Sequence, residues 1–296
     1  MDAHKTIALT GATGHVGGRL LPALLDAGHE VRCVVRDPAT ARLPAGARVV
    51  GGDVLSGEGL ADALAGADVA YYLVHSMGGA GDFAERDRRA ARTFGAAVRD
   101  ARVARTVYLG GLEGDDDGAS EHLRSRHEVA AVLRGLVPEL VHVRAAMIVG
   151  EGSASFQMLR GLVERLPVMI TPRWLQTRSQ PVAIADVVAA LAMLAVRPDA
   201  PAEVQLGGAD VLTYREMLGR YAAVAGRRPP VQIPVPLFTP RLSSYWVALV
   251  TPVSLGLVQP LVEGLHAETV VREPPPAGLN DAPLGFDAAV RAALAA

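Results

Sequence analysis

Short apolar runs alternate with amphipathic helical patterns from residue 5 to about residue 196. Strands that alternate with helices are typical of right-handed βαβ units, in which helices cover both faces of a parallel sheet. The predicted strands are Lys5–Thr10, Glu30–Val35, Arg48–Gly52, Asp68–Val74, Arg105–Leu109 and Leu140–Ala145. The predicted helices span residues 14–27, 58–65, 83–101, 120–136 and 185–196.

The first predicted strand runs into a glycine-spaced turn and then into a helical pattern. The turn reads Thr10-Gly11-Ala12-Thr13-Gly14-His15-Val16-Gly17. Gly11 permits a tight turn, Gly14 lets phosphates approach the backbone, and Gly17 lets the helix pack close to the sheet. The G-x-x-G-x-x-G spacing differs from the simplest fingerprint, but its place between a strand and a helix predicts a dinucleotide site. Thr13, His15 and Val16 belong to this predicted site.

The pattern changes after Gly150. Segment 151–180 joins a helical pattern to an apolar run, and segment 208–262 opens a helix at a Thr213–Glu216 capping box before a proline-rich run. We therefore expect an α/β protein with a Rossmann-like, doubly wound parallel sheet and a small, discontinuous C-terminal substrate lobe. The predicted sheet domain comprises residues 1–150 and 181–207, and the predicted lobe comprises residues 151–180 and 208–296.

Two positions bear on the adenosine half of a dinucleotide. Arg36 ends the second predicted strand, where an arginine can pair with the 2′-phosphate of NADP, whereas a carboxylate such as the adjacent Asp37 favours NAD. The arginine favours NADPH over NADH, and the alternative for Asp37 is a residue that starts the next loop. Asp53, after the third predicted strand, is placed to bond the adenine amino group or to serve as an ordinary turn residue.

Composition and charge narrow the class of partner. Half of the 296 residues are hydrophobic, 20% are charged, and the formal net charge is -2, which excludes a disordered chain. The charge gives no reason to expect nucleic acid or an anionic membrane as a partner. Cys33 is the only cysteine, and the N-terminus has no signal-peptide pattern, so we expect a cytoplasmic protein.

The stretch between Arg241 and Glu263 carries no charge and is about as long as a spanning helix. Pro252, Gly256 and Pro260 interrupt it, so we expect short helices that line an apolar pocket and no integral membrane segment. A small apolar molecule is therefore the expected substrate. The sequence is compatible with a homodimer.

The predicted helix 120–136 carries two polar residues on its apolar side. At ~100° per residue, His122 and Arg126 fall in the arc of Val129 and Leu133, whereas His127 lies opposite. His122 and His127 thus share no face, and no metal site is predicted. An inward arginine needs an acceptor, because an unpaired buried charge is costly. The cofactor ribose or phosphate could supply it, and so could an acidic side chain such as Asp115 or Glu113.

These motifs together resemble the atypical short-chain dehydrogenase/reductase superfamily, in its NmrA-like, NAD(P)H-binding branch. The resemblance covers nearly the whole chain and is carried by Thr10–Gly17, Asp53-Val54, Tyr72–Met77, Val143–Gly150 and Pro181–Asp186. It implies a Rossmann domain with a small C-terminal lobe. It also implies cofactor contacts from the matching glycines and from Asp53, Val54, Leu73, Val74 and His75.

The sequence departs from the catalytic pattern of that superfamily. Typical members carry Tyr-x-x-x-Lys on this helix and a serine at the end of the preceding strand, whereas the corresponding positions here hold His122, Arg126 and Gly110-Gly111. Three interpretations follow. His122 could donate the proton while Arg126 holds the nicotinamide ribose. Hydride could instead pass to a conjugated acceptor with water as the proton source, or the protein could bind cofactor without turnover.

We expect an NADPH-dependent reductase of a small apolar or aromatic acceptor, such as a quinone, enone, imine or ketone. The alternative is a non-catalytic NADP(H)-binding redox sensor, regulator or assembly factor. Epimerase, isomerase or lyase chemistry with a tightly held cofactor stays a third class.

Overall fold

A computed structural model describes residues 4–74, 83–112, 121–171, 173–234, 247–248, 251, 253 and 255–296. At its centre is a seven-stranded sheet in the order β11-β6-β5-β4-β1-β2-β3, with every neighbouring pair parallel. The strands are β1 (Thr6–Thr10), β2 (Glu30–Val35), β3 (Arg48–Gly51), β4 (Val69–Tyr72), β5 (Arg105–Gly111), β6 (Glu139–Ala145) and β11 (Glu203–Leu206). This strand order confirms the predicted Rossmann-like, doubly wound sheet.

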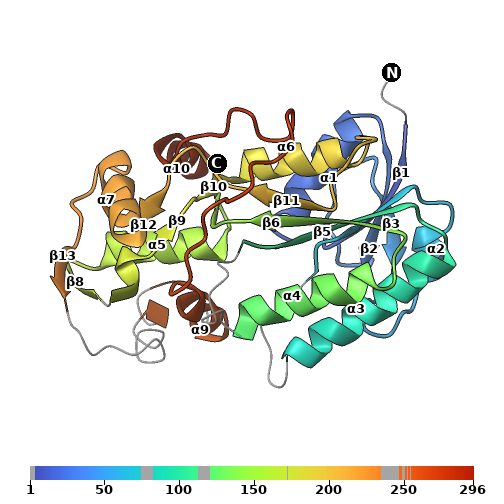
Figure 1. Ribbon diagram of the computed structural model, residues 1–296, viewed down its shortest axis with the longest axis horizontal. Helices are drawn as coiled ribbons and strands as arrows, with labels where there is room; N and C mark the ends of the chain where they lie inside the picture. Colours follow the sequence, from blue (N-terminus) through green and yellow to red (C-terminus); the bar gives the residue numbers. More distant parts are fainter. Residues whose placement is uncertain are drawn as a thin grey trace.

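Helices cover both faces of the sheet (Figure 1). On one face lie α1 (Gly17–Asp26) and α6 (Ile184–Leu194), and on the other lie α2 (Leu60–Leu64), α3 (Phe83–Asp100) and α4 (Glu121–Arg134). Successive strand residues point to opposite faces, so Ile7 and Leu9 pack in the apolar cluster of α1 and α6, while Ala8 packs in the cluster of α2, α3 and α4. The six predicted strands and five predicted helices all occur, within a few residues of their predicted bounds.

The seventh strand was not predicted. The expected alternation stopped near residue 196, yet β11 extends the sheet beyond β6, with Val204 paired to Val143. Strand β11 is only four residues long, with buried Val204 and Leu206 alternating with Glu203 and Gln205. Its apolar signal is too short to separate it from a loop by periodicity.

The remaining elements form a second body of packed structure, on the left of Figure 1. They comprise β7 (Ile148–Val149), α5 (Ala154–Arg165), β8 (Val168–Thr171), the 3-10 helix η1 (Arg173–Gln176), β9 (Arg178–Ser179), β10 (Val182–Ala183), β12 (Leu212–Thr213), α7 (Tyr214–Val224), β13 (Val231–Pro234), α9 (Leu255–Gly264) and α10 (Phe286–Ala295). Three two-stranded pairs, β10–β7, β12–β9 and β13–β8, tie these segments together. An apolar cluster that includes Phe156, Met217, Tyr221 and Phe286 forms their core.

Of the uncharged stretch between Arg241 and Glu263, the structure describes chiefly α9, a helix of 10 residues. In the described parts of the chain, no helix combines the length and the apolarity that a membrane span needs. The exact residue boundaries of the sheet domain and the lobe stay a prediction.

Candidate functional site

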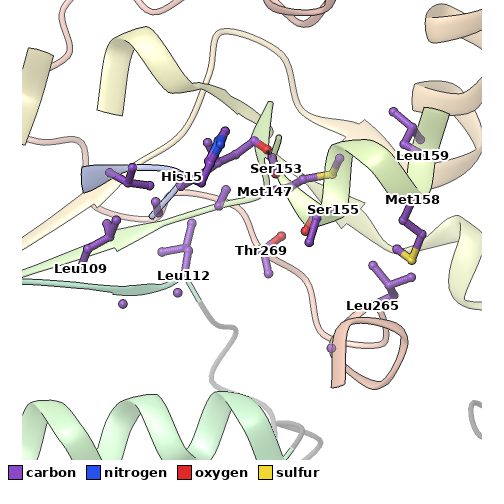
Figure 2. A pocket seen from close by; sticks show the side chains of 18 of the residues that line it. His15, Leu109, Leu112, Met147, Ser153, Ser155, Met158, Leu159, Leu265 and Thr269 are labelled. Carbon is purple, nitrogen blue, oxygen red and sulfur yellow. Dashed lines mark hydrogen bonds between the residues drawn. The ribbon is translucent and has the colours of Figure 1, made fainter. Parts of the chain in front are cut away.

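A cavity of about 320 Å³ opens between the carboxyl ends of the central strands and the lobe (Figure 2). Most of the side chains that line it are apolar, and Figure 2 shows leucines and methionines along its length. Its lining comes from the glycine turn, the ends of β5 and β6, helices α4, α5 and α7, and the chain around α9. The lining residues are Gly11, Gly14, His15, Val16, Gly17, Leu73, Leu109, Gly110, Gly111, Leu112, Arg126, Ala145, Ala146, Met147, Ile148, Ser153, Ala154, Ser155, Met158, Leu159, Leu162, Leu175, Tyr214, Leu218, Gly264, Leu265 and Thr269.

The glycines of the turn are required by its geometry. Gly11 has φ +73°, and a Cβ on it would lie 2.8 Å from the carbonyl oxygen of Leu73. A Cβ on Gly17 would lie 2.2 Å from the carbonyl oxygen of Gly11, so no side chain fits where α1 packs against the turn. Gly14 is exposed, which leaves its backbone open to a ligand.

The amino end of α1 fits an anionic group. The helix begins at Gly17, and its N-cap residue, Val16, makes no side-chain capping hydrogen bond. The Gly18 and Leu20 N–H groups already donate to the Gly14 and Val16 carbonyl oxygens at 2.9 Å, and the helix dipole makes this end of α1 positive. The residues present therefore fit a dinucleotide diphosphate at the turn.

At the adenosine end, the adjacent Arg36 and Asp37 differ in their partners. Both are exposed directly after β2. The Asp37 carboxylate accepts hydrogen bonds from the Ala39 N–H at 3.0 Å and from Thr40 Oγ1 at 3.0 Å. Asp37 therefore holds its own loop, as its alternative interpretation proposed. Over the described residues, Arg36 makes no ion pair.

Asp53 also serves its own turn. Its Oδ1 accepts a hydrogen bond from the Leu55 N–H at 2.6 Å, and its carbonyl oxygen accepts one from the Gly57 N–H at 2.8 Å. Both Asp53 and Val54 are half-buried. The turn role is thus filled by one carboxylate oxygen, and the predicted adenine contact stays a prediction.

The segment after β4 reaches the cavity through Leu73. The Leu73 N–H donates to Thr10 Oγ1 at 3.2 Å, and that hydroxyl donates to the Tyr71 carbonyl at 2.8 Å. Thr10 therefore fastens the end of β4 beside the glycine turn. Val74 is half-buried, and His75 lies outside the described residues.

Helix α4 places Arg126 in the lining of the cavity, half-buried. Val129 and Leu133 on the same side are buried, whereas His127 is exposed, as the helical arc predicts. The backbone of His122 belongs to α4, but its side chain lies outside what the structure describes, as do Glu113 and Asp115. The structure thus brings one of the two predicted catalytic residues to the cavity and leaves the other untested.

At the end of β5, the packing around Gly110 leaves no room for a serine at that residue. A Cβ on Gly110 would lie 2.6 Å from Nε2 of His142, which is buried and stacked on the Tyr108 ring with the centroids 5.1 Å apart. A serine at this position would have to displace a packed ring. Lys5, the only lysine of the chain, precedes β1 at the opposite end of the strands, so it cannot replace the missing catalytic lysine.

The His15 side chain takes part, through Arg19, in a link between the turn and the lobe, which the sequence did not indicate. Its Nδ1 lies 3.1 Å from Nη1 of Arg19, whose Nη2 donates to the carbonyl oxygen of Glu151 at 2.8 Å. Burial, with the Arg19 charge, lowers the pKa of His15 to about 4. A guanidinium can only donate, so Nδ1 accepts and the proton of this neutral ring sits on Nε2. Figure 2 shows the ring on the cavity side of the turn.

Polar groups also lie on the lobe wall of the cavity. Thr269 Oγ1 donates to Ser179 Oγ at 2.7 Å, and the Tyr214 hydroxyl is hydrogen-bonded to both. In the sequence, this region shows only the start of a helix. The capping box is present, since Thr213 Oγ1 accepts from the Glu216 N–H at 3.2 Å and Glu216 Oε2 accepts from the Thr213 N–H at 2.7 Å. The box fixes Tyr214 as the first helical residue, but nothing in the sequence pairs it with Thr269.

Comparison with known proteins agrees with this geometry. Residues 11–146 match the family model described as NAD(P)H-binding. Over 79 residues the chain is 40% identical to a 3-beta-hydroxysteroid dehydrogenase of Mycolicibacterium neoaurum, a stretch that covers 25% of this chain and 21% of that protein. The match thus spans about a fifth of the length of this relative.

Two solved structures share the fold along nearly the whole chain. A triphenylmethane reductase of Citrobacter sp. aligns with a TM-score of 0.76 and 19% identity, over 98% of this chain and 100% of that one. An NAD-dependent NDP-hexosamine 5,6-dehydratase of tunicamycin biosynthesis aligns with a TM-score of 0.68 and 18% identity, over 98% and 97%. At 18% and 19% sequence identity, the similarity to these two structures shows a shared fold.

The turn, the sheet and the matched domain define an NAD(P)-binding protein with a Rossmann fold. The solved structures share the fold of the chain, and the NAD(P)H-binding model matches residues 11–146; assignment to the atypical short-chain dehydrogenases/reductases stays a prediction. Membership of the NmrA-like branch stays a prediction.

Proposed function

We propose that the protein is an NADPH-dependent reductase of a small apolar or aromatic acceptor, such as a quinone, enone, imine or ketone. The observation that carries the proposal is a single cavity that begins at the glycine turn and continues between apolar side chains of the lobe, including Met158 and Leu265. Apolar lining favours a substrate with little polar surface. The names of two similar proteins agree in part, because a steroid is largely apolar and a triphenylmethane dye carries three aromatic rings.

In this proposal the sheet domain holds the cofactor, which supplies a hydride when bound. The turn and the start of α1 bind the diphosphate, Arg36 pairs with the 2′-phosphate, and Asp53 contacts the adenine. Arg36 carries the preference for NADPH over NADH. The full set of proposed cofactor contacts is Gly11, Thr13, Gly14, His15, Val16, Gly17, Arg36, Asp53, Val54, Leu73, Val74, His75 and Arg126.

Helix α4 supplies the proposed chemistry. Arg126, in the lining of the cavity, holds hydroxyl groups of the nicotinamide ribose, and His122, one helical turn earlier, donates the proton to the substrate oxygen. An imidazole suits this role because its ordinary pKa lies near neutrality.

A second candidate function has its own motivating observation. The close contact of Gly110 with the His142 ring leaves no room for a serine at residue 110, and the chain has no lysine besides Lys5. Cofactor binding without turnover, in a redox sensor, regulator or assembly factor, accounts for the absence of the usual serine and lysine.

NADPH oxidation across a panel of quinones, enones, imines and ketones separates the two candidates. We expect turnover by the unaltered protein and a loss of kcat of about 10²–10⁴-fold in His122→Ala, with unchanged NADPH affinity. His127→Ala, on the exposed side of α4, is the matched control and keeps full activity. Unchanged turnover in His122→Ala assigns the proton to water and leaves the reductase proposal standing.

Saturable NADPH binding without turnover on any acceptor supports the regulator. Failure of both coenzymes to bind saturably contradicts both candidate functions.

A further inference from the structure

Three hydroxyl groups from three separate segments meet on the lobe side of the cavity. They belong to Ser179 at the end of β9, Tyr214 at the start of α7, and Thr269 in the chain after α9. Thr269 Oγ1 donates to Ser179 Oγ at 2.7 Å, and the Tyr214 hydroxyl is hydrogen-bonded to both. We call these three side chains the hydroxyl cluster.

Two members of the hydroxyl cluster line the cavity, and the third lies behind them. Tyr214 and Thr269 are lining residues, whereas Ser179 is fully buried. In the view of Figure 2, Thr269 lies between Leu112 on the side of the sheet and Leu265 on the side of the lobe. The backbone holds the cluster in place, because the Thr269 N–H donates to the Arg178 carbonyl and the Gln180 N–H donates to the Thr269 carbonyl.

The charged neighbours of the hydroxyl cluster along the chain, Arg178 and Glu268, pair with each other in an exposed ion pair, and the cavity beside the cluster is lined mostly by apolar residues. Burial raises the pKa of the Tyr214 hydroxyl to about 12, so it is protonated at neutral pH. Among the described residues that line the cavity, the groups able to carry positive charge are Arg126 and His15, which belong to α4 and the glycine turn. A carboxylate or phosphate at the cluster would lose its hydration without a counter-charge from it, whereas a neutral oxygen loses much less.

Counting protons shows what the cluster can bind. Each hydroxyl supplies one proton and accepts up to two hydrogen bonds. Three hydroxyls joined in a ring therefore use three protons and three acceptor sites, so acceptor sites remain for a ligand hydroxyl. One proton can also turn from the ring to a ligand carbonyl while each protein oxygen keeps a hydrogen bond. The cluster suits a hydroxyl or a carbonyl oxygen equally.

We propose that the hydroxyl cluster binds a neutral hydroxyl or carbonyl oxygen of an otherwise apolar substrate, and so sets which apolar molecules the cavity accepts. Tyr214 and Thr269 contact that oxygen, and Ser179 positions them. The inference rests on the proposed function for the identity of the cavity as the substrate site. It narrows the substrate class to apolar molecules with a hydrogen-bonding oxygen on the lobe side.

The test compares two probes that differ by one hydroxyl, 2-naphthol and naphthalene, by isothermal titration calorimetry on the protein with and without saturating NADP⁺. We expect the protein to bind 2-naphthol roughly 2- to 12-fold more tightly, which is the usual worth of one hydrogen bond. Thr269→Val and Tyr214→Phe each remove a hydroxyl and nearly keep the shape, so the ratio falls to about one while naphthalene affinity stays unchanged. Thr269→Ser keeps the hydroxyl and keeps the ratio.

The proposal is overturned by a ratio near one in the unaltered protein, by an unchanged ratio in Thr269→Val, or by equal losses of affinity for both probes in that variant. Absence of binding by either probe overturns it too. A purely structural role lowers the melting temperature without changing the ratio. If Tyr214→Phe does not fold, Thr269→Val alone decides, because that side chain is only half-buried.

The outcome is separable from that of the proposed function. An affinity ratio of 2-naphthol to naphthalene near one, together with intact NADPH binding and turnover, contradicts only the proposal for the hydroxyl cluster. If the protein prefers 2-naphthol but binds no NADPH, only the proposed reductase function is contradicted.

Discussion

At the scale of single residues, local hydrogen bonds decide what a charged side chain is available to do. Asp37 is committed to the loop it starts, through Ala39 and Thr40, whereas the neighbouring Arg36 is exposed and makes no ion pair in the described part of the chain. A carboxylate held in its own loop competes poorly for a ribose hydroxyl. This difference supports Arg36, and not Asp37, as the residue that contacts the 2′-position of the adenosine ribose.

Arg36→Ala should therefore weaken NADPH binding and leave NADH binding unchanged. The loss of a charge-assisted pair with a phosphate is worth about 1.5–3 kcal/mol, roughly 10- to 100-fold in Kd. Fluorescence titration with each coenzyme measures the effect. Arg99→Ala, an exposed α3 arginine paired with Asp100, is the charge-matched control and should change neither affinity. Equal weakening of both coenzymes by Arg36→Ala would remove Arg36 from this role.

A second residue links the core to acid stability. His142 is buried in the sheet, and burial lowers its pKa from 6.5 to about 3. The unfolded chain therefore binds a proton at a higher pH than the folded protein does. The contribution of His142 to stability is complete above pH 6.5 and is lost as the pH falls from 6.5 towards 3.

Replacing this histidine should flatten the pH dependence. At pH 5 the linkage of His142 amounts to about 2 kcal/mol relative to pH 7. His142→Gln cannot titrate, so its free energy of unfolding should fall by about 2 kcal/mol less over this range, as measured by urea denaturation at both pH values. His4→Gln, on an exposed histidine, should behave like the unaltered protein. The same pH dependence in all three proteins would mean that His142 is not the group that titrates.

At the scale of elements, the start of α7 connects helix stability to the cavity. Thr213 and Glu216 satisfy each other's backbone N–H groups in the capping box, which fixes where the helix begins and hence where Tyr214 stands. The box lies in the lobe, outside the glycine turn and its contacts. Helix stability and cofactor binding should therefore respond separately.

Thr213→Ala should lower the free energy of unfolding by about 1 kcal/mol, since it removes the N-cap acceptor. NADPH affinity should not change. Glu216→Gln is the matched control, because a glutamine can also complete a capping box and should keep most of the stability. Chemical denaturation and NADPH titration on both variants test this. A fall in NADPH affinity as large as the fall in stability would show that the lobe and the turn are not separable in this way.

The elements were predictable where a signal is local and long. The strand–turn–helix at Gly11–Gly17 and the α3 and α4 patterns carry their periodicity in adjacent residues, so the sequence alone located them. Strand β11 was missed because four residues at the sheet edge give only two alternations. Its existence depends on the exposed edge of β6, which a reading along the chain does not see.

At the scale of the whole molecule, the unpredicted part of the site is the part assembled from distant segments. Ser179, Tyr214 and Thr269 come together only because β9 pairs with β12 and because Ser179 forms a bridge with Thr269, in the chain after α9.

 The bridge between Ser179 and Thr269 is a tertiary contact, and no local pattern encodes it. The same holds for the link from Arg19 to Glu151, which joins α1 to the turn before α5. Periodicity predicts which face of an element is buried, but it does not predict which distant side chain meets it.

These links predict how the molecule unfolds with its cofactor. The chain passes repeatedly between sheet domain and lobe, and β7 pairs with β10 where the two meet. We expect one cooperative thermal transition that NADPH at 100 times its Kd stabilises by about 2.7 kcal/mol, a rise of roughly 5 °C. Gly17→Ala, whose Cβ would lie 2.2 Å from the Gly11 oxygen, should lose this rise. Gly18→Ala, whose Cβ would lie 3.4 Å from the Ala12 oxygen, should keep it. Two calorimetric transitions, only one of which moves with NADPH, would mean that the lobe folds independently of the cofactor site.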